Sequence, residues 1–261
     1  AKSNILISII EAAAELYPKA VFSIHLDHGD EEHAFDAIAS NKYNSVMIDA
    51  SHDDFNTNVK RTKLVVEKAH KKNIMVEAEL GILSGKEDDI SIDEKFAKYT
   101  NPDEAQSFVK ETSCDSLAVA VGTSHGAYKF QGVEGIQFSI LEDIQRRLPN
   151  FPIVLHGGSA VNLEEIKRIN LSGGNLDNGT AGVPSDEIVK AINYGVCKIN
   201  IATDLRLLWA RVHREFFKNS PKLFDPVIPG KKYIEEFEKF MIKKFDLLGS
   251  FDKANQILLN N

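Results

Sequence analysis

The sequence predicts an α/β fold and, within that class, a (β/α)8 barrel. Short apolar runs rich in β-branched residues alternate with longer stretches of helical periodicity along the 261 residues. This alternation is typical of βα units, whose strands lie parallel in one sheet. Histidine and acidic side chains stand at the ends of several predicted strands, as expected where all strand ends open onto one face of a barrel. An open doubly wound sheet is the alternative.

The predicted strands are short apolar runs bounded by polar or turn-forming residues. They span 21–26, 45–50, 74–79, 117–121, 152–156 and 196–201. The predicted helices carry apolar residues at spacings of three and four. They span 5–17, 31–40, 55–72, 102–111, 138–148, 163–169, 185–194, 203–219 and 233–248.

Particular residues support several of these boundaries. Pro18 ends the first helix because proline cannot continue one. Pro102 stands in the first turn of its helix, where the missing N–H does no harm. Residues 81–100 have weak periodicity and carry glycine, serine and several acids, which predicts a long mobile loop. A stretch rich in glycine and asparagine at 172–184 predicts a second loop.

The number of strands falls short of a complete barrel. Six are predicted, whereas a (β/α)8 barrel has eight strands in typically about 250 residues. We therefore expect a single barrel domain over 1–261, including C-terminal helices at about 203–248 and lacking its first two βα units. The chain starts in a helical pattern without an initiator Met, so the natural start is expected to be absent. Because an open barrel exposes strand edges, this piece alone is expected to be unstable or inactive.

Composition narrows the function classes. The net charge of −7 argues against a general nucleic-acid or anionic-membrane surface. Two cysteines, Cys114 and Cys197, do not make a disulfide framework, which favours the reducing cytoplasm. No apolar run approaches the roughly 18 residues of a membrane span, and the start does not read as a signal peptide.

Three histidines occupy similar places in the predicted barrel. His28 and His156 stand at strand ends, and His125 lies in the loop after 117–121. Parallel strands end on one face, so the three are expected to converge there. Three imidazoles and one open position suit a catalytic zinc ion. The alternative is that each is an ordinary loop or helix-capping histidine.

Several acids stand near the same face. Asp27, beside His28, is a candidate for proton transfer next to a metal, or else a helix cap or a partner of a metal ligand. Glu77 and Glu79 share one strand face, and burying both is costly without a cation or donor partner. Glu87 lies in the predicted mobile loop, as a solvated surface acid or as an acid/base that arrives with substrate.

The late loops suit a phosphate group. Gly157, Gly158 and Ser159 let backbone N–H groups approach an anion, and Thr203 opens a helix whose N-terminus favours negative charge. Barrel enzymes often bind phosphate with the loops after their last two strands. Arg206 is a candidate for a second phosphate. Lys198 is either a Schiff-base nucleophile or an ordinary packed lysine.

These motifs together resemble one enzyme family. The sequence is similar over nearly its whole length to class II, zinc-dependent fructose-1,6-bisphosphate aldolases. The similarity rests on HLDHGD (25–30), SVMIDASH (45–52), VEAELG (76–81), GTSHGAYKF (122–130), VLHGGSA (154–160) and VCKINIATDLR (196–206). The resemblance implies a (β/α)8 barrel, with Zn2+ held by His28, His125 and His156 and with Glu79 at an alternative metal position.

The resemblance also implies the reaction and its other residues. Fructose 1,6-bisphosphate is cleaved reversibly, in glycolysis and gluconeogenesis, by zinc-stabilised enediolate chemistry. Asp27 acts at the C4 hydroxyl, and Glu87 protonates the enediolate. The phosphorylated sugar is bound by Gly126, Gly157, Ser159, Asn200, Thr203 and Arg206. A monovalent cation, Na+ or K+, often assists in this family, whose members are commonly homodimers or homotetramers.

Position 202 departs from the fructose-type pattern. Ala202 stands where those enzymes often carry aspartate, and alanine there resembles some tagatose-1,6-bisphosphate aldolases. Asp204 and Arg206 still look like the fructose type. Ala202 thus leaves a tagatose-bisphosphate aldolase as one alternative. Two others rest on different observations: a lysine-dependent aldolase using Lys198, and a truncated non-catalytic zinc-binding relative.

Overall fold

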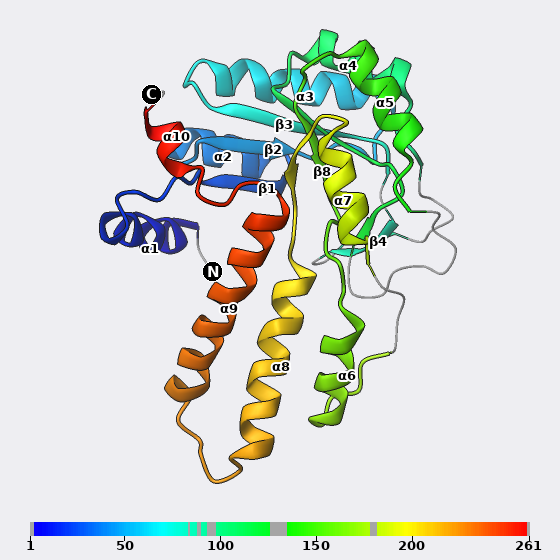
Figure 1. Cartoon of the computed structure of the whole chain (residues 1–261). Helices are drawn as coiled ribbons and strands as arrows, with labels where there is room; N and C mark the ends of the chain where they lie inside the picture. The colour runs from blue at the N-terminus through cyan, green and yellow to red at the C-terminus, as the bar shows by residue number, and fades with distance from the viewer. Residues whose placement is uncertain are drawn as a thin grey trace. The chain divides into compact units, whose positions relative to one another are not determined.

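The computed structural model describes residues 3–82, 84–87, 90–92, 98–125, 135–177 and 182–259 (Figure 1). Six strands form a sheet in the order β1-β2-β3-β6-β8-β9. Their bounds are β1 His25–Gly29, β2 Ser45–Ile48, β3 Met75–Leu80, β6 Ser116–Val119, β8 Ile153–Leu155 and β9 Val196–Ile199. The pairs β1·β2, β2·β3 and β8·β9 run parallel. The predicted parallel α/β fold is confirmed, with six strands of the eight in a complete barrel.

Helices lie between the strands as the periodicity predicts. Their bounds are α1 Ser3–Leu16, α2 Glu31–Ser40, α3 Phe55–His70, α4 Pro102–Thr112, α5 Phe138–Arg147, α6 Leu163–Leu171, α7 Ser185–Ile192, α8 Thr203–Asn219, α9 Val227–Leu247 and α10 Ala254–Leu259. None of the described helices combines the length and the apolar character that crossing a bilayer demands.

Some predicted boundaries are wrong. Residues 81–100 are not simply a loop, because β4 (Ser84–Glu87) pairs antiparallel with β5 (Ile90–Ile92) and parallel with β7 (Ser124–His125). Backbone hydrogen bonds form this small sheet, and they leave little trace in apolar periodicity. Helix α9 begins at Val227 rather than at residue 233, since Pro229 is tolerated in a first helical turn. Helix α10 was not predicted.

The contacts divide the chain into two compact units, and each is described by itself. Unit 1 comprises Ala1–Glu79, Ser107–Leu117 and Ser250–Asn261, and unit 2 comprises Leu80–Gln106 and Ala118–Gly249. The single domain over 1–261 stays a prediction.

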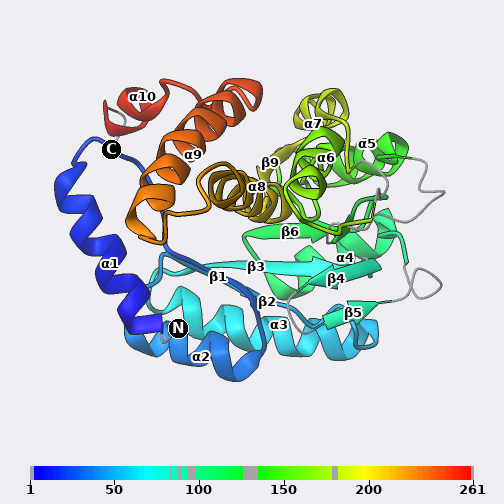
Figure 2. The same cartoon turned by 90° about the horizontal axis from the view of Figure 1, so that it is seen from below.

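Unit 1 is built on the strands β1 and β2 and the start of β3, with α2 and α3 packed on one side of them (Figure 2). Aspartates begin both helices: Asp30 accepts a hydrogen bond from the His33 N–H, and Asp54 accepts one from the Thr57 N–H. The middle of β2 is fully buried at Val46, Met47 and Ile48. This packing fixes where the strands end, and the candidate site lies at those ends.

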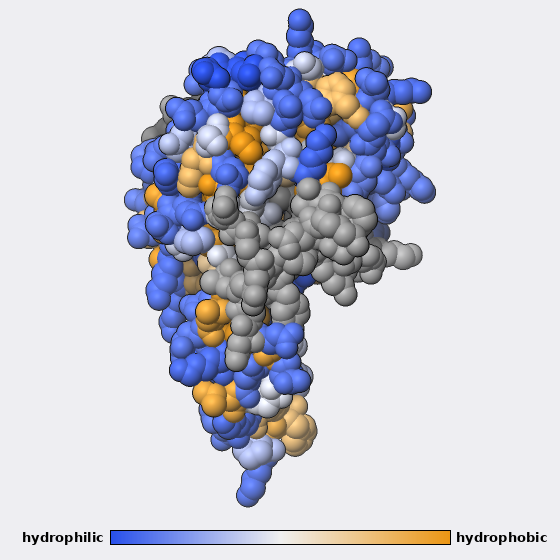
Figure 3. All heavy atoms as spheres, turned by 90° about the vertical axis from the view of Figure 1, so that its right-hand side faces the viewer, coloured by the Kyte–Doolittle hydropathy of each residue, from blue (hydrophilic) through white to orange (hydrophobic). Residues whose placement is uncertain are grey.

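Unit 2 contains the helices α5 to α9. An apolar cluster joins α6 to α8 through Ile166, Ile169 and Leu207. The turn between α8 and α9 leaves apolar side chains exposed, with Phe224 90% exposed. Hydrophobic residues accordingly show among the hydrophilic ones at the lower end of Figure 3.

The two cysteines lie in different units and are not joined to each other. Cys114 of unit 1 is buried, and burial raises the pKa of its thiol to about 12. Cys197 of unit 2 lies in β9 and is exposed.

Candidate metal centre and phosphate cradle

The first part of the site is the carboxyl end of β1. The strand begins four residues later than predicted and runs to Gly29, so Asp27 and His28 lie inside it. The β1·β2 register shifts between Leu26 and Gly29, and His28 adopts a left-handed backbone with φ +45°. Non-glycine residues seldom adopt this conformation, and it concentrates at functional sites. The irregularity alters the regular alternation of side chains at the strand end.

His28 lies in a cluster with two acids from neighbouring strands. Its Nδ1 atom is 3.0 Å from Asp49 Oδ2 and 4.0 Å from Glu79 Oε2. Asp49 follows β2, and Glu79 lies near the end of β3 with only 3% of its surface exposed. One nitrogen or oxygen atom from each of the three lies within 4.8 Å of the others. One imidazole and two carboxylates form a donor set suited to a borderline divalent metal such as zinc.

Asp49 is held in its charged form. Burial raises its pKa, but hydrogen bonds from His28 and Ser51 outweigh burial and leave the pKa well below its usual value. The Ser51 hydroxyl donates to Asp49 Oδ1 over 2.7 Å, and the Ser51 N–H donates to the same oxygen. Asp49 therefore accepts the Nδ1 proton of His28, which fixes the tautomer and the orientation of the ring.

Asp49 was missed as a site residue, although it lies within the quoted motif at 45–52. It directly follows a buried strand, as His156 does. The strand-end argument used for the histidines, applied to acids, would have found it.

A second cluster lies beside the first within unit 1. His25 Nε2 is 3.8 Å from Glu77 Oε2 and 3.9 Å from Asp27 Oδ1, and its Nδ1 atom is 2.7 Å from the Ser45 hydroxyl. Glu77 is 3% exposed, whereas the Asp27 side chain is 47% exposed. Asp27 is thus the acid of this cluster that solvent or substrate can reach.

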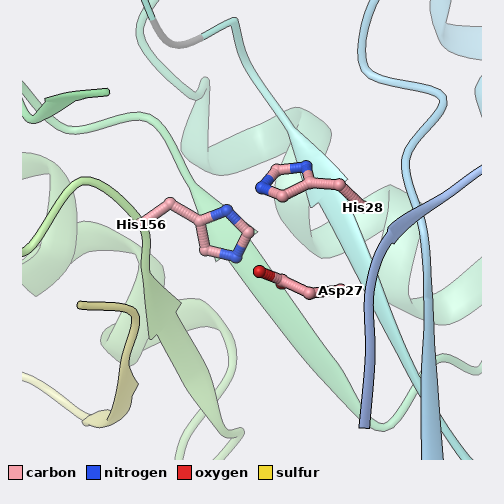
Figure 4. Close-up of side chains that lie close together, drawn as sticks. All are labelled: Asp27, His28 and His156. Carbon is pink, nitrogen blue, oxygen red and sulfur yellow. The ribbon is translucent and has the colours of Figure 1, made fainter. Parts of the chain in front are cut away.

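Of the other two predicted metal ligands, the structure describes the side chain of His156 but only the backbone of His125. Figure 4 shows Asp27 and His28, which come from β1, and His156, which directly follows β8. His156 belongs to unit 2 and is fully buried. The backbone of His125 lies in β7, but its side chain lies outside the described part of the structure.

Two further predicted residues are only partly covered. Glu87 is placed by its backbone at the end of β4, and its side chain is outside the described residues. Gly126 lies wholly outside them.

The described residues of the predicted phosphate site follow β8 and β9 in unit 2: Gly157, Ser159, Asn200, Thr203 and Arg206. The Gly158 N–H donates to the Asn200 carbonyl over 3.2 Å, and the Asn200 N–H donates to the Leu155 carbonyl over 3.0 Å. Gly157 has φ +65°, which favours glycine, and a Cβ on Gly158 would lie 2.4 Å from Ile199 Cγ2. The glycines are therefore needed for the loop to pass this close to β9.

The amino end of α8 borders the same region. Thr203 is its first residue, and Ala202 offers no side-chain cap to the N–H groups of the first turn. Ser159 and Thr203 are both buried, and Arg206 lies one turn into the helix. An uncapped helix start beside a glycine loop is a suitable place for an anion.

Comparison with known proteins identifies the class of protein. The curated fructose-bisphosphate aldolase of Thermus caldophilus is 43% identical over 235 residues, which cover 89% of this chain and 75% of that protein. The fructose-bisphosphate aldolase of Giardia intestinalis is 42% identical over 246 residues, covering 92% and 75%. These relatives are lyases, and the chain is an enzyme of that class.

The family follows from its own model and from solved structures. The model described as fructose-bisphosphate aldolase class-II matches residues 1–175 and 176–253. The crystal structure of the YdjI aldolase from Escherichia coli K12 superposes with a TM-score of 0.69 and 26% identity, covering 97% of this chain and 78% of that one. A putative fructose-1,6-bisphosphate aldolase from Coccidioides immitis gives a TM-score of 0.71 at 25% identity, covering 89% and 73%. The chain belongs to the class II fructose-bisphosphate aldolase family, which implies a divalent metal and a phosphorylated sugar substrate.

Proposed function

We propose that this protein reversibly cleaves fructose 1,6-bisphosphate into dihydroxyacetone phosphate and glyceraldehyde 3-phosphate, in glycolysis and gluconeogenesis. The observation that carries the proposal is the His28–Asp49 pair beside Glu79 in a chain of this family, because Asp49 orients the imidazole and Glu79 brings a carboxylate near it.

The metal in this proposal is Zn2+, held by His28, His125 and His156, with Glu79 at an alternative position. Asp49 holds Nδ1 of His28, so Nε2 is the nitrogen that would face the metal. When bound, zinc supplies Lewis-acid polarisation of the substrate carbonyl.

Proton transfer is assigned to two acids. Asp27 accepts the proton of the C4 hydroxyl, and its exposure within the His25 cluster supports this role. The C3–C4 bond then breaks, its electron pair remains on C3, and the aldehyde product leaves. Glu87 donates a proton to C3 and so completes dihydroxyacetone phosphate.

The phosphate groups are assigned to unit 2. Gly126, Gly157, Ser159 and Thr203 surround the phosphate of the dihydroxyacetone part, together with Na+ or K+, and Asn200 orients that part. Arg206 takes the other phosphate. The uncapped start of α8 supports this assignment.

Assembly and compartment complete the proposal. We expect a homodimer or homotetramer, for which the exposed apolar side chains around the α8–α9 turn are suited. Two cysteines are too few for a disulfide framework, which supports a cytoplasmic location.

The test is cleavage of fructose 1,6-bisphosphate and of its tagatose epimer, before chelation, after chelation and after zinc is restored. Activity on the fructose sugar that disappears with chelator and returns with zinc is expected. Preference for the tagatose sugar would assign Ala202 a role in epimer selection. Chelator-insensitive activity would support Lys198 instead, and zinc binding without cleavage of either sugar would support a non-catalytic relative.

A further inference from the structure

The loop after β8 is held by one carboxylate from α8. Asp204 Oδ2 accepts a hydrogen bond from the Ala160 N–H over 3.0 Å, and Oδ1 accepts one from the Val161 N–H over 2.8 Å. The Asp204 side chain is 6% exposed. A buried carboxylate bound to two consecutive N–H groups fixes the backbone between them. Asp204 therefore fixes the backbone conformation of this loop directly after Gly157 and Ser159, the proposed phosphate residues.

The backbone held by Asp204 is strained. Val161 has φ +46° and is fully buried. A β-branched residue in the left-handed region is a genuine outlier, and such strain persists only where surrounding contacts impose it. The hydrogen bond to Asp204 is one such contact, and the Gly182 N–H, which donates to the Ala160 carbonyl over 2.8 Å, is another.

Asp204 itself is held by a lysine from α9. Lys244 Nζ lies 3.1 Å from Asp204 Oδ2, and its side chain is only 12% exposed. The ammonium also lies 5.4 Å from the centre of the Phe240 ring, one turn earlier on α9. The pair borders a cavity of about 570 Å3 between α6, α8 and α9, which Lys243 also lines. Removal of the lysine would leave the buried carboxylate without its cation.

These contacts form a chain from α9 to the phosphate loop. We propose that Lys244 is a positioning residue: through Asp204 it holds the loop after β8 in the conformation that binds the phosphate of dihydroxyacetone phosphate. The inference rests on the proposed function, because Gly157 and Ser159 of that loop are the proposed phosphate residues. Lys244 touches neither the substrate nor the metal in this account, so its effect is confined to the geometry of one subsite.

The kinetic test uses the condensation direction with the zinc-loaded enzyme, because there the two substrates have separate KM values. Lys244→Met is expected to raise the KM for dihydroxyacetone phosphate by about tenfold while the KM for glyceraldehyde 3-phosphate changes little. Lys244→Arg, which keeps the charge, is expected to restore the first KM. Lys243→Met is the matched control on the same helix and cavity, and it should leave both values unchanged.

Hydrogen exchange provides a readout that does not depend on activity. The N–H groups of Ala160 and Val161 are expected to exchange faster in Lys244→Met than in the wild type or in Lys243→Met. If Lys244→Met does not fold, Lys244→Met combined with Asp204→Asn avoids a buried unpaired charge, and it should still show the raised KM and the faster exchange.

The outcomes separate the two proposals. Unchanged KM and unchanged exchange in the folded lysine variants overturn the positioning role of Lys244 while cleavage by the wild type stands. A uniform rise in both KM values that Lys244→Arg does not reverse also overturns it. An inactive wild type in which Lys244→Met still accelerates exchange at Ala160 and Val161 supports the contact chain and refutes the proposed activity.

Discussion

Two ionic clusters, one in each unit, obtain their positive charge in different ways. In unit 1, His28 faces the carboxylates of Asp49 and Glu79. Hydrogen bonds from His28 and Ser51 hold the pKa of Asp49 below its usual value, so that acid is charged. Imidazole and carboxylate side chains are donors that suit a divalent cation, which agrees with the metal centre that we propose here.

In unit 2, the cation is part of the chain. Arg211 is 5% exposed and contacts Glu165, Glu215 and Glu236, while Arg168 shares Glu215. Burial raises the pKa of both Glu215 and Glu236, but their hydrogen bonds with arginine outweigh burial and lower it. Lys239 also contacts Glu236, so three glutamates meet two arginines and one lysine in a network that joins α6, α8 and α9.

The difference teaches how to separate a binding centre from a structural one. Acids gathered around one imidazole are a candidate binding centre, whereas acids paired with arginine and lysine side chains indicate a structural role. Both clusters contain acidic side chains, so composition alone does not distinguish them.

The largest expected effect is loss of the metal centre. His28→Ala should lower kcat/KM by about a thousandfold, because a metal contributes several kcal/mol of charge stabilisation. The measurements are bound zinc per chain and the rate of fructose 1,6-bisphosphate cleavage. His33→Ala is the control, since the His33 side chain is 71% exposed. Full activity in His28→Ala would contradict the assignment of this cluster.

Removing the built-in cation should affect stability instead. Arg211→Met removes a buried cation that contacts three partly exposed glutamates, and it should lower the free energy of unfolding by about 3 kcal/mol. Urea titration measures this change, with Arg146→Met as the control because the Arg146 side chain is 71% exposed. A loss no greater than in the control would mean that the network contributes little to folding.

Asp49→Asn tests the orientation of His28 with a smaller expected effect. Metal affinity should fall by about 10- to 100-fold, because the partner that fixes the imidazole is weakened. Competition with a zinc chelator gives the affinity, and added zinc should recover most of the activity. Ser51→Ala provides a milder step in the same series, since it removes one hydrogen bond to Asp49.

The smallest expected effect is the acid dependence of the Arg211 network. Glu215 and Glu236 have pKa values lowered from 4.5, so they bind fewer protons folded than unfolded. Their stabilisation is present above pH 4.5 and is lost as the pH falls through their folded values. Free energies of unfolding between pH 6 and pH 3 should decline more steeply in the wild type than in Arg211→Met. Parallel declines in the wild type and in Arg211→Met would show that Arg211 does not lower the pKa values of these acids in the folded state.

Sequence patterns predicted the helices and strands in which apolar side chains alternate with polar ones according to their burial. The helix at 31–40 and the strand starting at Ser45 follow from apolar periodicity and appear at those positions. The β4·β5 pair was missed because it depends on backbone hydrogen bonds, and β1 was placed too early because its polar end, Asp27 and His28, does not resemble a strand.

The candidate site was predictable where a residue stands at a strand end. His28, Glu79 and the glycine loop after β8 were identified on that basis. The sequence could not reveal the links between helices, such as Arg211 with Glu236 or Lys244 with Asp204. Periodicity tells which face of a helix is buried, but not which charged group from another helix meets it.

The two cysteines lie at positions where their chemical modification can detect local opening of unit 1. Cys197 is an exposed residue in the native protein, whereas Cys114 is enclosed and the pKa of its thiol is raised to about 12. Only the thiolate reacts with alkylating reagents, so Cys114 reacts only when its surroundings open. Because the two thiols belong to different units, the delay between their modification reports how often unit 1 opens. The rate of Cys114 modification therefore measures local opening of the unit that contains His28, Asp49 and Glu79.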